Sequence, residues 1–260
     1  MPEGAAFKLI GLGGVGGIVA RHLAVFLAAL GCETRLVLID GDAFEPANRS
    51  RMLFHRAGNK AAVVRDELLE RFADTPLCLT AVEEFVSKEN LQRLVRNGDT
   101  VLLAVDNHAT RKLVNDHCAR LPNVCLVSGG NDGVGADSSG RVRRGTFGNA
   151  QIFVRRNGRD LTPPLTHHHA EIAHPTDAHP ADKSCTDLIT SVPQILFVNL
   201  MAASAILNSL WLQLCGRLHY GEVVFDIAEG LMRPIPLAHA ESRGAAGVQR
   251  GKIGCAKSET

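Results

Sequence analysis

Three groups of residues in the N-terminal half have the types and spacings that a phosphorylated ligand requires. The first is the glycine run GLGGVGG at residues 11–17, which contains the pattern G-x-G-x-x-G. Backbone without Cβ atoms turns tightly and brings N–H groups close to phosphate oxygens. A helix that begins there adds partial positive charge at the same place. The run predicts a nucleotide site, but dehydrogenases carry it too, so it leaves the chemistry open.

The second group follows an apolar segment at residues 35–39. Asp40 comes directly after this segment, where a carboxylate is placed to accept hydrogen bonds from ribose hydroxyls. A dehydrogenase needs only that one acid. Here a second acid, an amide and two cations follow, and extra cations suit a triphosphate better than a pyrophosphate. These residues are Asp42, Asn48, Arg51 and Lys60.

The third group is Asp106 and Asn107, with Arg111 four residues later, after an apolar run at 100–105. A carboxylate that faces phosphates already ringed by cations is suited to hold Mg²⁺, which binds one or two carboxylates together with phosphate oxygens. All three groups fall at or just beyond the carboxyl ends of expected strands, where open α/β sheets bind ligands.

The elements that must position these groups alternate regularly through the first half. Apolar runs typical of strands lie at 6–10, 35–39, 77–82, 100–105 and 124–128, and helical patterns at 15–30, 60–72, 89–95 and 107–121. This β-α-β alternation predicts an α/β fold: a Rossmann-like, mostly parallel sheet with helices on both faces.

The second half has a different pattern. It is expected to hold a glycine-rich hairpin, short antiparallel strands, a polar crossover loop rich in Pro and His, and one long buried helix. We interpret the histidines as part of a solvated loop and not as a metal site. We expect one domain with a flexible tail. The ranges are 129–148 for the hairpin, 151–154 and 222–227 for the strands, about 157–189 for the crossover loop, 190–215 for the helix, 1–237 for the domain and 238–260 for the tail.

Composition excludes several classes of protein. The 260 residues carry a net charge of +1, so no overall field favours nucleic acid or an anionic membrane as a partner. The seven cysteines form no C-x-x-C pair, and the N-terminus has no pattern of a signal peptide. We therefore expect a cytoplasmic protein without a disulfide framework or a structural zinc site.

The order of the motifs adds a resemblance. The motifs that carry the resemblance are, in order, G-x-G-G-x-G, D-x-D-x-x-x-x-x-N-x-x-R, a lysine, and D-N-x-x-x-R. Over roughly residues 6–230 the chain resembles the ubiquitin-activating ThiF/MoeB/HesA superfamily. The resemblance implies ATP and Mg²⁺: ribose at Asp40, catalytic roles for Arg51, Lys60 and Asp106, and the metal at Asp106. Residues that it assigns to ATP are Gly11, Gly13, Gly14, Gly16, Asp40, Asp42, Asn48, Arg51, Lys60 and Asn107.

The chain also departs from the superfamily. Met52 stands where a glutamine usually follows the arginine, and the two C-x-x-C pairs that hold zinc in many members are absent. Residues 1–5 alone precede the first strand, so an arginine reaching a partner's ATP is missing or comes from elsewhere. The sequence thus resembles a minimal, zinc-less bacterial type of member.

Cys185 is the candidate acyl acceptor. It lies in a polar loop before a long helix, where related activating enzymes carry their nucleophile, and Lys183 and a nearby helix N-terminus would favour the thiolate. The cysteines of the strands and helices are interpreted as core residues. These are Cys32, Cys78, Cys118, Cys125 and Cys215.

The resemblance leads to one main hypothesis. The protein would adenylate the C-terminal glycine of a ubiquitin-like protein, form a thioester at Cys185, pass the acyl group to a conjugating partner, and act as a homodimer. Adenylation alone, of a sulfur-carrier protein or a peptide, is the alternative. A non-catalytic nucleotide-binding protein and an NAD-dependent oxidoreductase also remain open.

Overall fold

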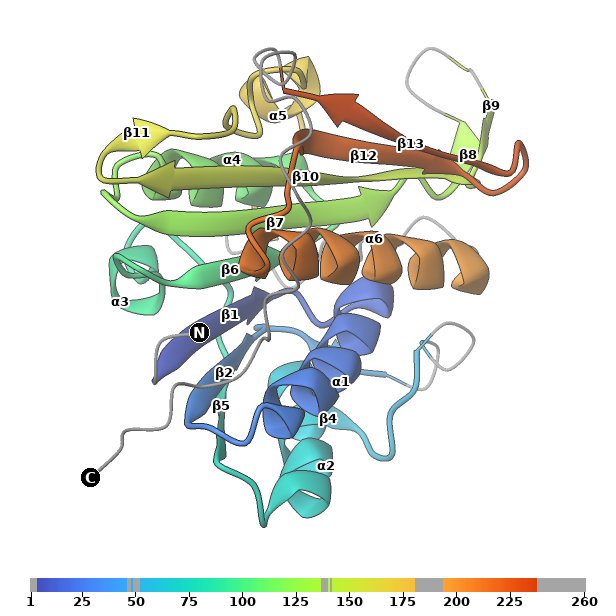
Figure 1. The fold of residues 1–260 in the computed structure, drawn as a ribbon. Helices are drawn as coiled ribbons and strands as arrows, with labels where there is room; N and C mark the ends of the chain where they lie inside the picture. The colour runs from blue at the N-terminus through green and yellow to red at the C-terminus, as the bar shows by residue number, and fades with distance from the viewer. Residues whose placement is uncertain are drawn as a thin grey trace.

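A single large sheet runs through the protein. The computed structural model describes residues 4–45, 48, 52–136, 140, 142–180 and 194–237. Within these residues nine strands form one sheet in the order β13-β12-β10-β7-β6-β1-β2-β5, with β11 paired to β10 (Figure 1). Five neighbouring strands are parallel: β1 (Ala5–Ile10), β2 (Thr34–Ile39), β5 (Leu77–Val82), β6 (Thr100–Leu103) and β7 (Val124–Asn131).

The rest of the sheet is antiparallel. The strand β7 pairs antiparallel with β10, and from there every neighbour alternates in direction. These strands are β10 (Phe147–Arg156), β11 (Arg159–Asp160), β12 (Tyr220–Asp226) and β13 (Leu231–Pro236). Two small ribbons lie outside the sheet: β3 (Ala43–Phe44) with β4 (Gly58–Asn59), and β8 (Val134–Ala136) with β9 (Val142–Arg144).

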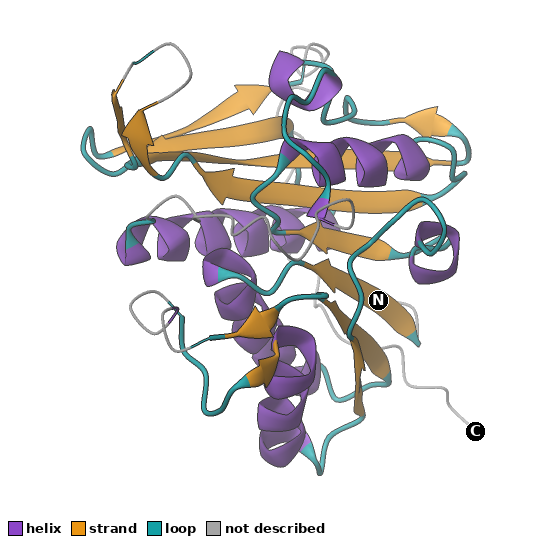
Figure 2. Ribbon diagram, turned by 180° about the vertical axis from the view of Figure 1, so that it is seen from behind, coloured by secondary structure: helices purple, strands orange, loops and turns teal. Residues whose placement is uncertain are grey.

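Helices cover both faces of the sheet, as Figures 1 and 2 show from opposite sides. On one face lie α1 (Gly14–Ala29), α2 (Lys60–Phe72) and α6 (Leu196–Leu214). On the other lie α3 (Leu91–Leu94), α4 (His108–Cys118) and α5 (Ala170–Ala173). Because both faces are covered, the parallel strands are apolar at almost every position. Leu38 and Leu102 contact one core, and Val37 and Leu103 the other.

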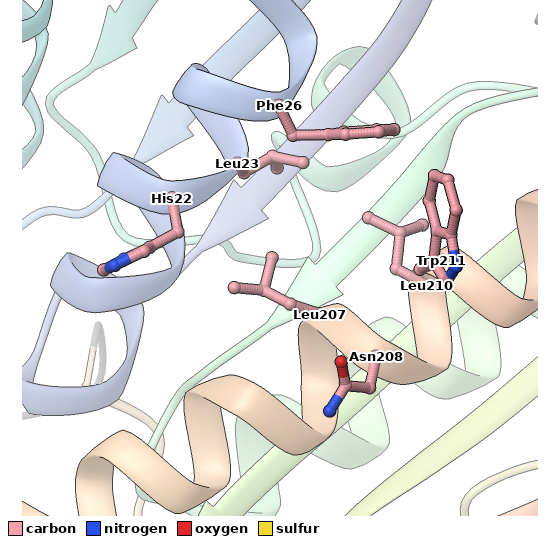
Figure 3. Close-up of a pocket in the computed structure, with 7 residues that line it drawn as sticks. All are labelled: His22, Leu23, Phe26, Leu207, Asn208, Leu210 and Trp211. Atoms are coloured by element: carbon pink, nitrogen blue, oxygen red, sulfur yellow. The ribbon is translucent and has the colours of Figure 1, made fainter. Parts of the chain in front are cut away.

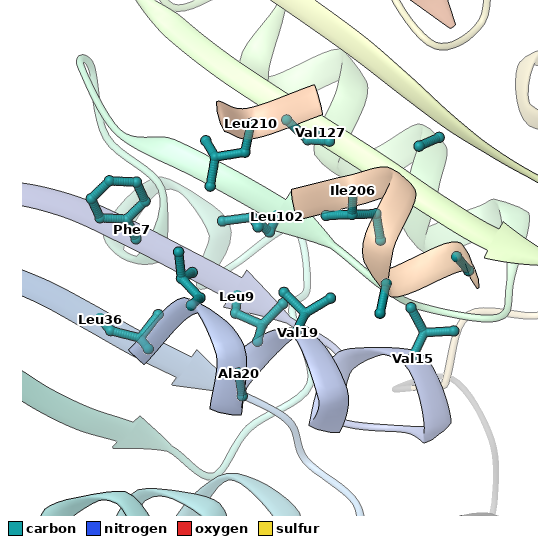
Figure 4. Packing of buried hydrophobic residues seen from close by; sticks show 14 of the residues in the cluster. Phe7, Leu9, Val15, Val19, Ala20, Leu36, Leu102, Val127, Ile206 and Leu210 are labelled. Carbon is teal, nitrogen blue, oxygen red and sulfur yellow. The ribbon is translucent and has the colours of Figure 1, made fainter. Parts of the chain in front are cut away.

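The larger core forms where α1 and α6 pack on the centre of the sheet (Figure 4). Val19 of α1 lies over Leu9 of β1, and Ile206 of α6 lies over β7. The approach of α6 is close: a Cβ atom on Gly129 would lie 2.7 Å from Cγ1 of Ile206. Glycine in β7 therefore lets α6 rest against the strand backbone.

Helix α6 has one buried face and one exposed apolar face. By length and composition it could cross a membrane, with a mean hydropathy of 1.4, yet 44% of that window is buried in this structure. Core helices of ordinary globular domains have the same character. Phe197 is 68% exposed, and Leu196 and Leu200 are exposed too. The expectation of a fully buried helix is thus only partly right, and residues 190–193 lie outside the described residues.

The predicted fold class is confirmed, whereas parts of the second half differ. The segment from 157 is not one solvated loop, because it holds β11 and α5 and buries Leu165 and Ile172. Strand β13 was not expected. Cys78 is exposed and not a core residue, since β5 ends the sheet and its side chains alternate between core and solvent. Cys118 and Cys125 are buried as expected, and Cys215 is half-buried.

Removal of a buried side chain should test this core. Leu102 of β6 is fully buried in the core that the sheet forms with α1 and α6. Leu102→Ala should therefore lower the free energy of unfolding by about 2–5 kcal/mol. The exposed Leu161 provides the matched control, and Leu161→Ala should change it by less than about 0.5 kcal/mol. Urea unfolding followed by circular dichroism measures both, and equal losses would contradict the assignment of Leu102 to the core.

Candidate functional site

The glycine run forms the loop between β1 and α1, beside the carboxyl ends of β2 and β6. The N–H of Gly11 donates to the carbonyl of Ile39 at 2.9 Å, and that of Ala104 donates to the carbonyl of Ile10 at 2.9 Å. Gly11 has a φ of +88°, and a Cβ there would lie 2.9 Å from the Ala104 carbonyl oxygen. The ends of β1, β2 and β6 therefore meet at this loop, and the backbone at Gly11 requires glycine.

Three other glycines of the run have different surroundings. A Cβ on Gly16 would lie 1.8 Å from the carbonyl oxygen of Gly11, so the loop and the helix pack directly together. A Cβ on Gly14 would lie 2.4 Å from the buried amide nitrogen of Asn199 on α6. Gly13 is different, because the nearest atom to its Cβ position is Cε of Met52 at 3.9 Å. Packing requires Gly11, Gly14 and Gly16, while Gly13 borders open space.

Asp40 fixes this loop to the end of β2. Its Oδ2 accepts a hydrogen bond from the N–H of Leu12 at 2.5 Å, and its Oδ1 accepts one from the N–H of Asp42 at 2.8 Å. The carboxylate is buried, and burial raises the pKa of Asp40, while Lys60 and the two N–H groups act in the opposite direction. Asp40 thus shapes the loop in addition to any contact it makes with ribose.

Lys60 and Asp42 form an ion pair beside Asp40. Lys60 is the first residue of α2 and is buried, whereas the Asp42 carboxylate is largely exposed. Asn59 holds this arrangement: its Oδ1 accepts from the N–H of Ala62, and its Nδ2 donates to the carbonyl of Asp40 at 2.8 Å. The sequence analysis missed Asn59, although an Asn directly before a helix is a recognised capping signal.

Asp106 lies on the other side of the glycine loop, after β6. It is exposed, and in the described part of the chain its carboxylate has no hydrogen-bond or ion-pair partner. Asn107 caps α4, since its Oδ1 accepts from the N–H of Thr110 at 2.8 Å. The side-chain oxygen of Asn107, a residue expected to bind ATP, is therefore already bound to the backbone of α4.

Arg111 stabilises the turn between β6 and α4 from the interior of the protein. Its guanidinium donates to Oγ of Ser128 at 2.9 Å and to the carbonyl of Val105 at 2.8 Å. Burial lowers the pKa of Arg111 to about 10, so the group stays protonated at neutral pH. Arg111 joins the end of β6 to β7 and does not face open space.

The remaining predicted residues are placed only in part. Asn48 closes a local turn, in which its Oδ1 accepts from the N–H of Glu45 at 3.0 Å. Arg51 and Cys185 lie outside the described residues. The structure therefore brings together the glycine loop, Asp40, Asp42, Lys60 and Asp106, and the roles of Arg51 and Cys185 stay predictions.

Two cavities in the described part of the chain lie elsewhere. One of about 170 Å³ separates α1 from α6 and is lined by Phe26, Leu210 and Trp211 among others (Figure 3). It is smaller than a typical ligand pocket of about 300–1,000 Å³. Another, of about 730 Å³, lies at the amino ends of β6 and β7, beside Arg96 and Asn97. We place the candidate site at the glycine loop because its close backbone approaches and its clustered charges are the features that phosphate binding needs.

A family model now adds to this geometry. It matches residues 5–236 and describes the ThiF family. The chain belongs to the ThiF family. This confirms the resemblance seen in the sequence, and membership of this family favours adenylation over the oxidoreductase hypothesis.

Individual relatives agree with the ThiF assignment. "Adenylyltransferase and sulfurtransferase MOCS3" of Drosophila ananassae is 38% identical over 132 residues, which cover 49% of this chain and 27% of that protein. The protein of the same name from Dictyostelium discoideum is 34% identical over 123 residues, covering 46% and 28%. The match thus spans about a quarter of the length of these curated relatives.

Solved structures support the same fold. E. coli MccB with ATP superposes with a TM-score of 0.64 at 16% identity, covering 89% of this chain and 64% of that one. "Microcin C7 biosynthetic enzyme MccB in complex with N-formylated MccA" gives 0.62 at 19% identity, covering 89% and 64%. At such identities the likeness establishes the fold alone.

A charged network on the α5 side of this ThiF-type fold was not expected. His169 lies between two carboxylates: Nδ1 is 2.8 Å from Oε1 of Glu171, and Nε2 is 3.1 Å from both oxygens of Glu222. Glu222 is buried on β12 and also accepts from Nδ2 of Asn149 at 2.7 Å. The hydrogen bond to Glu222 raises the pKa of His169. This histidine therefore links the segment before α5 to the sheet.

The His169 network should make stability depend on pH. A histidine whose pKa is raised by folding stabilises the fold fully below its unfolded pKa of about 6.5, and this contribution is lost as pH rises through the folded pKa. His169→Gln should therefore cost about 1–2 kcal/mol of unfolding free energy at pH 6 and much less at pH 9. Urea unfolding at both pH values measures it.

The exposed His168 is the matched control. His168→Gln should leave the unfolding free energy unchanged within about 0.5 kcal/mol at either pH. A cost for His169→Gln that is the same at pH 6 and pH 9 would show that the charge of His169 does not contribute.

Proposed function

We propose that this protein uses ATP to adenylate the C-terminal glycine of a ubiquitin-like protein and then carries the acyl group on Cys185 as a thioester. The observation that carries the first step is the meeting of the glycine loop, Asp40, Lys60 and Asp106 at adjacent strand ends in a chain of the ThiF family. A conjugating partner would take the acyl group from Cys185.

The first step needs positioning and charge neutralisation. A carboxylate oxygen of the partner's terminal glycine attacks the α-phosphorus of ATP, and the bond from that phosphorus to the bridging oxygen of the β-phosphate breaks. Pyrophosphate leaves, and an acyl-adenylate forms. Loop N–H groups beside Gly13 hold the α-phosphate, and Lys60, with Arg51, neutralises the charge that the leaving pyrophosphate gains.

Lys60 has to change partners for this role. In this structure it is paired with Asp42, whose side chain is largely exposed. Phosphate oxygens compete with that carboxylate for the ammonium group, and the exposed Asp42 carboxylate can be solvated by water when Lys60 leaves it. The buried stem of Lys60 meanwhile keeps the charge at the site.

Asp106 would hold Mg²⁺. Its exposed carboxylate has no partner in the described part of the chain, which fits a ligand that joins phosphate oxygens around the ion. Within the described residues no group of three or more His, Cys, Asp or Glu could hold a metal by itself, so the ion would arrive with the nucleotide. Bound there, Mg²⁺ supplies neutralisation of phosphate charge.

The second step assigns a nucleophile. The thiolate of Cys185 attacks the acyl carbon, the bond to the phosphate oxygen breaks, and AMP leaves. Cys118 and Cys125 are poor candidates, because burial raises the pKa of each thiol to about 12. Cys78 is exposed but lies on β5 at the end of the sheet.

Adenylation without a thioester is the second candidate function. The relatives named above support it, since one is called an adenylyltransferase and sulfurtransferase and MccB has been solved with MccA. In that case the acceptor would be a sulfur-carrier protein or a peptide, and Cys185 would be dispensable.

We further propose a homodimer that acts in the cytoplasm without nucleic acid or membrane. Exposed apolar side chains on α1 and α6 support the dimer, among them Val25, Phe197 and Trp211. Exposed apolar side chains on two helices that pack together are a feature of many protein interfaces.

Exchange of labelled pyrophosphate into ATP tests the chemistry. With a small protein ending in glycine as substrate, the wild type should catalyse exchange. Asp106→Ala should reduce it by about 100-fold or more, because phosphate charge is left unneutralised. Cys185→Ala should spare exchange and abolish a thiol-sensitive adduct with the substrate on a non-reducing gel.

The outcomes separate the alternatives. Exchange without any adduct in the wild type would support adenylation alone. An adduct that persists in Cys185→Ala would overturn the assignment of that cysteine, and no exchange with any acyl substrate would contradict the activity.

A matched pair of glycine substitutions tests the loop as the nucleotide site. Gly13→Ala adds a Cβ that would meet only Cε of Met52, at 3.9 Å, so the free energy of unfolding should stay within about 1 kcal/mol of wild type, the scale of a weaker helix cap, while ATP affinity falls about tenfold. Gly16→Ala forces a Cβ against the Gly11 carbonyl and should cost about 1–3 kcal/mol of stability. Unchanged ATP affinity in Gly13→Ala would place the nucleotide elsewhere.

A further inference from the structure

Asp177 makes a contact that the proposed chemistry does not use. Its Oδ2 accepts a hydrogen bond from the N–H of His108 at 2.6 Å, and its Oδ1 accepts one from the N–H of Ala109 at 2.9 Å. These are the first two residues of α4, and they directly follow Asp106 and Asn107. A residue far along the chain thus binds the backbone next to the candidate metal ligand.

The first turn of α4 is satisfied entirely within the protein. A helix begins with N–H groups that have no partner in the helix itself. Asp177 takes those of His108 and Ala109, and Asn107 takes that of Thr110. A carboxylate at this end also meets the positive pole of the helix, and charge-assisted bonds to N–H groups are the stronger kind. The start of α4 therefore has a fixed direction.

The segment that carries Asp177 is itself anchored. The N–H of Leu165 donates to Oδ1 of Asn115 on α4 at 2.8 Å, and Leu165 and Ile172 are buried. His169 joins the same segment to Glu222 on β12. Asp177 itself is exposed, but it follows Ile172 by five residues, so these buried anchors fix the stretch from which Asp177 reaches α4.

Asp106 lies between two fixed points. On its N-terminal side Arg111 donates to the carbonyl of Val105 at 2.8 Å, and on its C-terminal side Asp177 accepts from the two N–H groups of α4. Asp106 itself is exposed, and its carboxylate makes no hydrogen bond or ion pair with the described residues. Its direction depends on the backbone that these contacts hold.

We propose that Asp177 is a positioning residue, which fixes the turn at 105–109 so that the Asp106 carboxylate faces the nucleotide phosphates and their Mg²⁺. Asp177 need not touch the nucleotide, because both of its oxygens bind backbone N–H groups. This inference rests on the proposed function of the same site.

A double-mutant cycle tests it by nucleotide binding. Titration calorimetry with ATP and Mg²⁺ gives a dissociation constant for each protein. Asp177→Ala should raise that constant about tenfold, near the effect of a lost helix cap, and should raise the Mg²⁺ concentration needed for half-maximal binding. Asp177→Asn keeps one acceptor and should lie between Asp177→Ala and the wild type.

The combination with Asp106 distinguishes positioning from general stabilisation. If Asp177 acts through Asp106, Asp177→Ala should weaken binding no further in an Asp106→Ala background. Losses that simply multiply in the double variant would overturn the proposal. Unchanged affinity in Asp177→Ala would overturn it as well.

Two further measurements complete the test. Amide hydrogen exchange should become faster at His108 and Ala109 in Asp177→Ala, and unchanged exchange would contradict the contact. Asp116→Ala, which removes a half-buried carboxylate of α4 that pairs with Lys112, should leave ATP affinity unchanged. Absence of ATP binding by the wild type would count against the proposed function, whereas wild-type binding with an unaffected Asp177→Ala counts against this inference alone.

Discussion

The buried carboxylate of Asp40 is the contact on which the candidate site depends. It accepts the N–H of Leu12 from the glycine loop and the N–H of Asp42 from its own strand end. Removal of a carboxylate from water is costly, and these two bonds and the charge of Lys60 compensate for it. The loop between β1 and α1 is therefore held against β2, which opens the backbone beside Gly13 toward a ligand.

Most charged groups around this loop already have a partner in the chain. Lys60 pairs with Asp42, Arg111 is buried against Ser128 and two carbonyl oxygens, and Asp177 binds the start of α4. Asp106 differs, since its carboxylate is exposed and forms no hydrogen bond or ion pair within the described residues. Such an arrangement would be pre-organised for the proposed ligand, because a nucleotide would only have to displace Asp42 from Lys60 and gain Asp106 through Mg²⁺.

Local patterns were sufficient to predict the parallel half of the fold. The limits of α2, Lys60–Phe72, and of β5, Leu77–Val82, agree with the sequence prediction. Strong periodicity, glycine at a turn and acids at strand ends are signals that lie within a few residues of each other. The same local signals predict that Asp40, Lys60 and Asp106 lie at or just beyond the carboxyl ends of strands.

Contacts between distant segments had no such signal. Asp177 meets His108 across 69 positions and His169 meets Glu222 across 53, and nothing in either neighbourhood specifies the partner. The polar composition around His169 suggested solvent, and Glu171 is only two residues away, but Glu222, the buried carboxylate that holds the other ring nitrogen, comes from β12. Strand β13 was missed for a related reason, since Pro234 and Pro236 argue against a strand and are tolerated there only because β13 is an edge.

The central claim is that the glycine loop, Asp40, Lys60 and Asp106 bind ATP together with Mg²⁺. Calorimetric titration of the purified protein with ATP and with NAD, each with and without Mg²⁺, tests this claim most directly. The account predicts saturable binding of ATP that strengthens when Mg²⁺ is present, and much weaker binding of NAD. Binding of NAD in preference to ATP, or ATP binding that is indifferent to Mg²⁺, would contradict it.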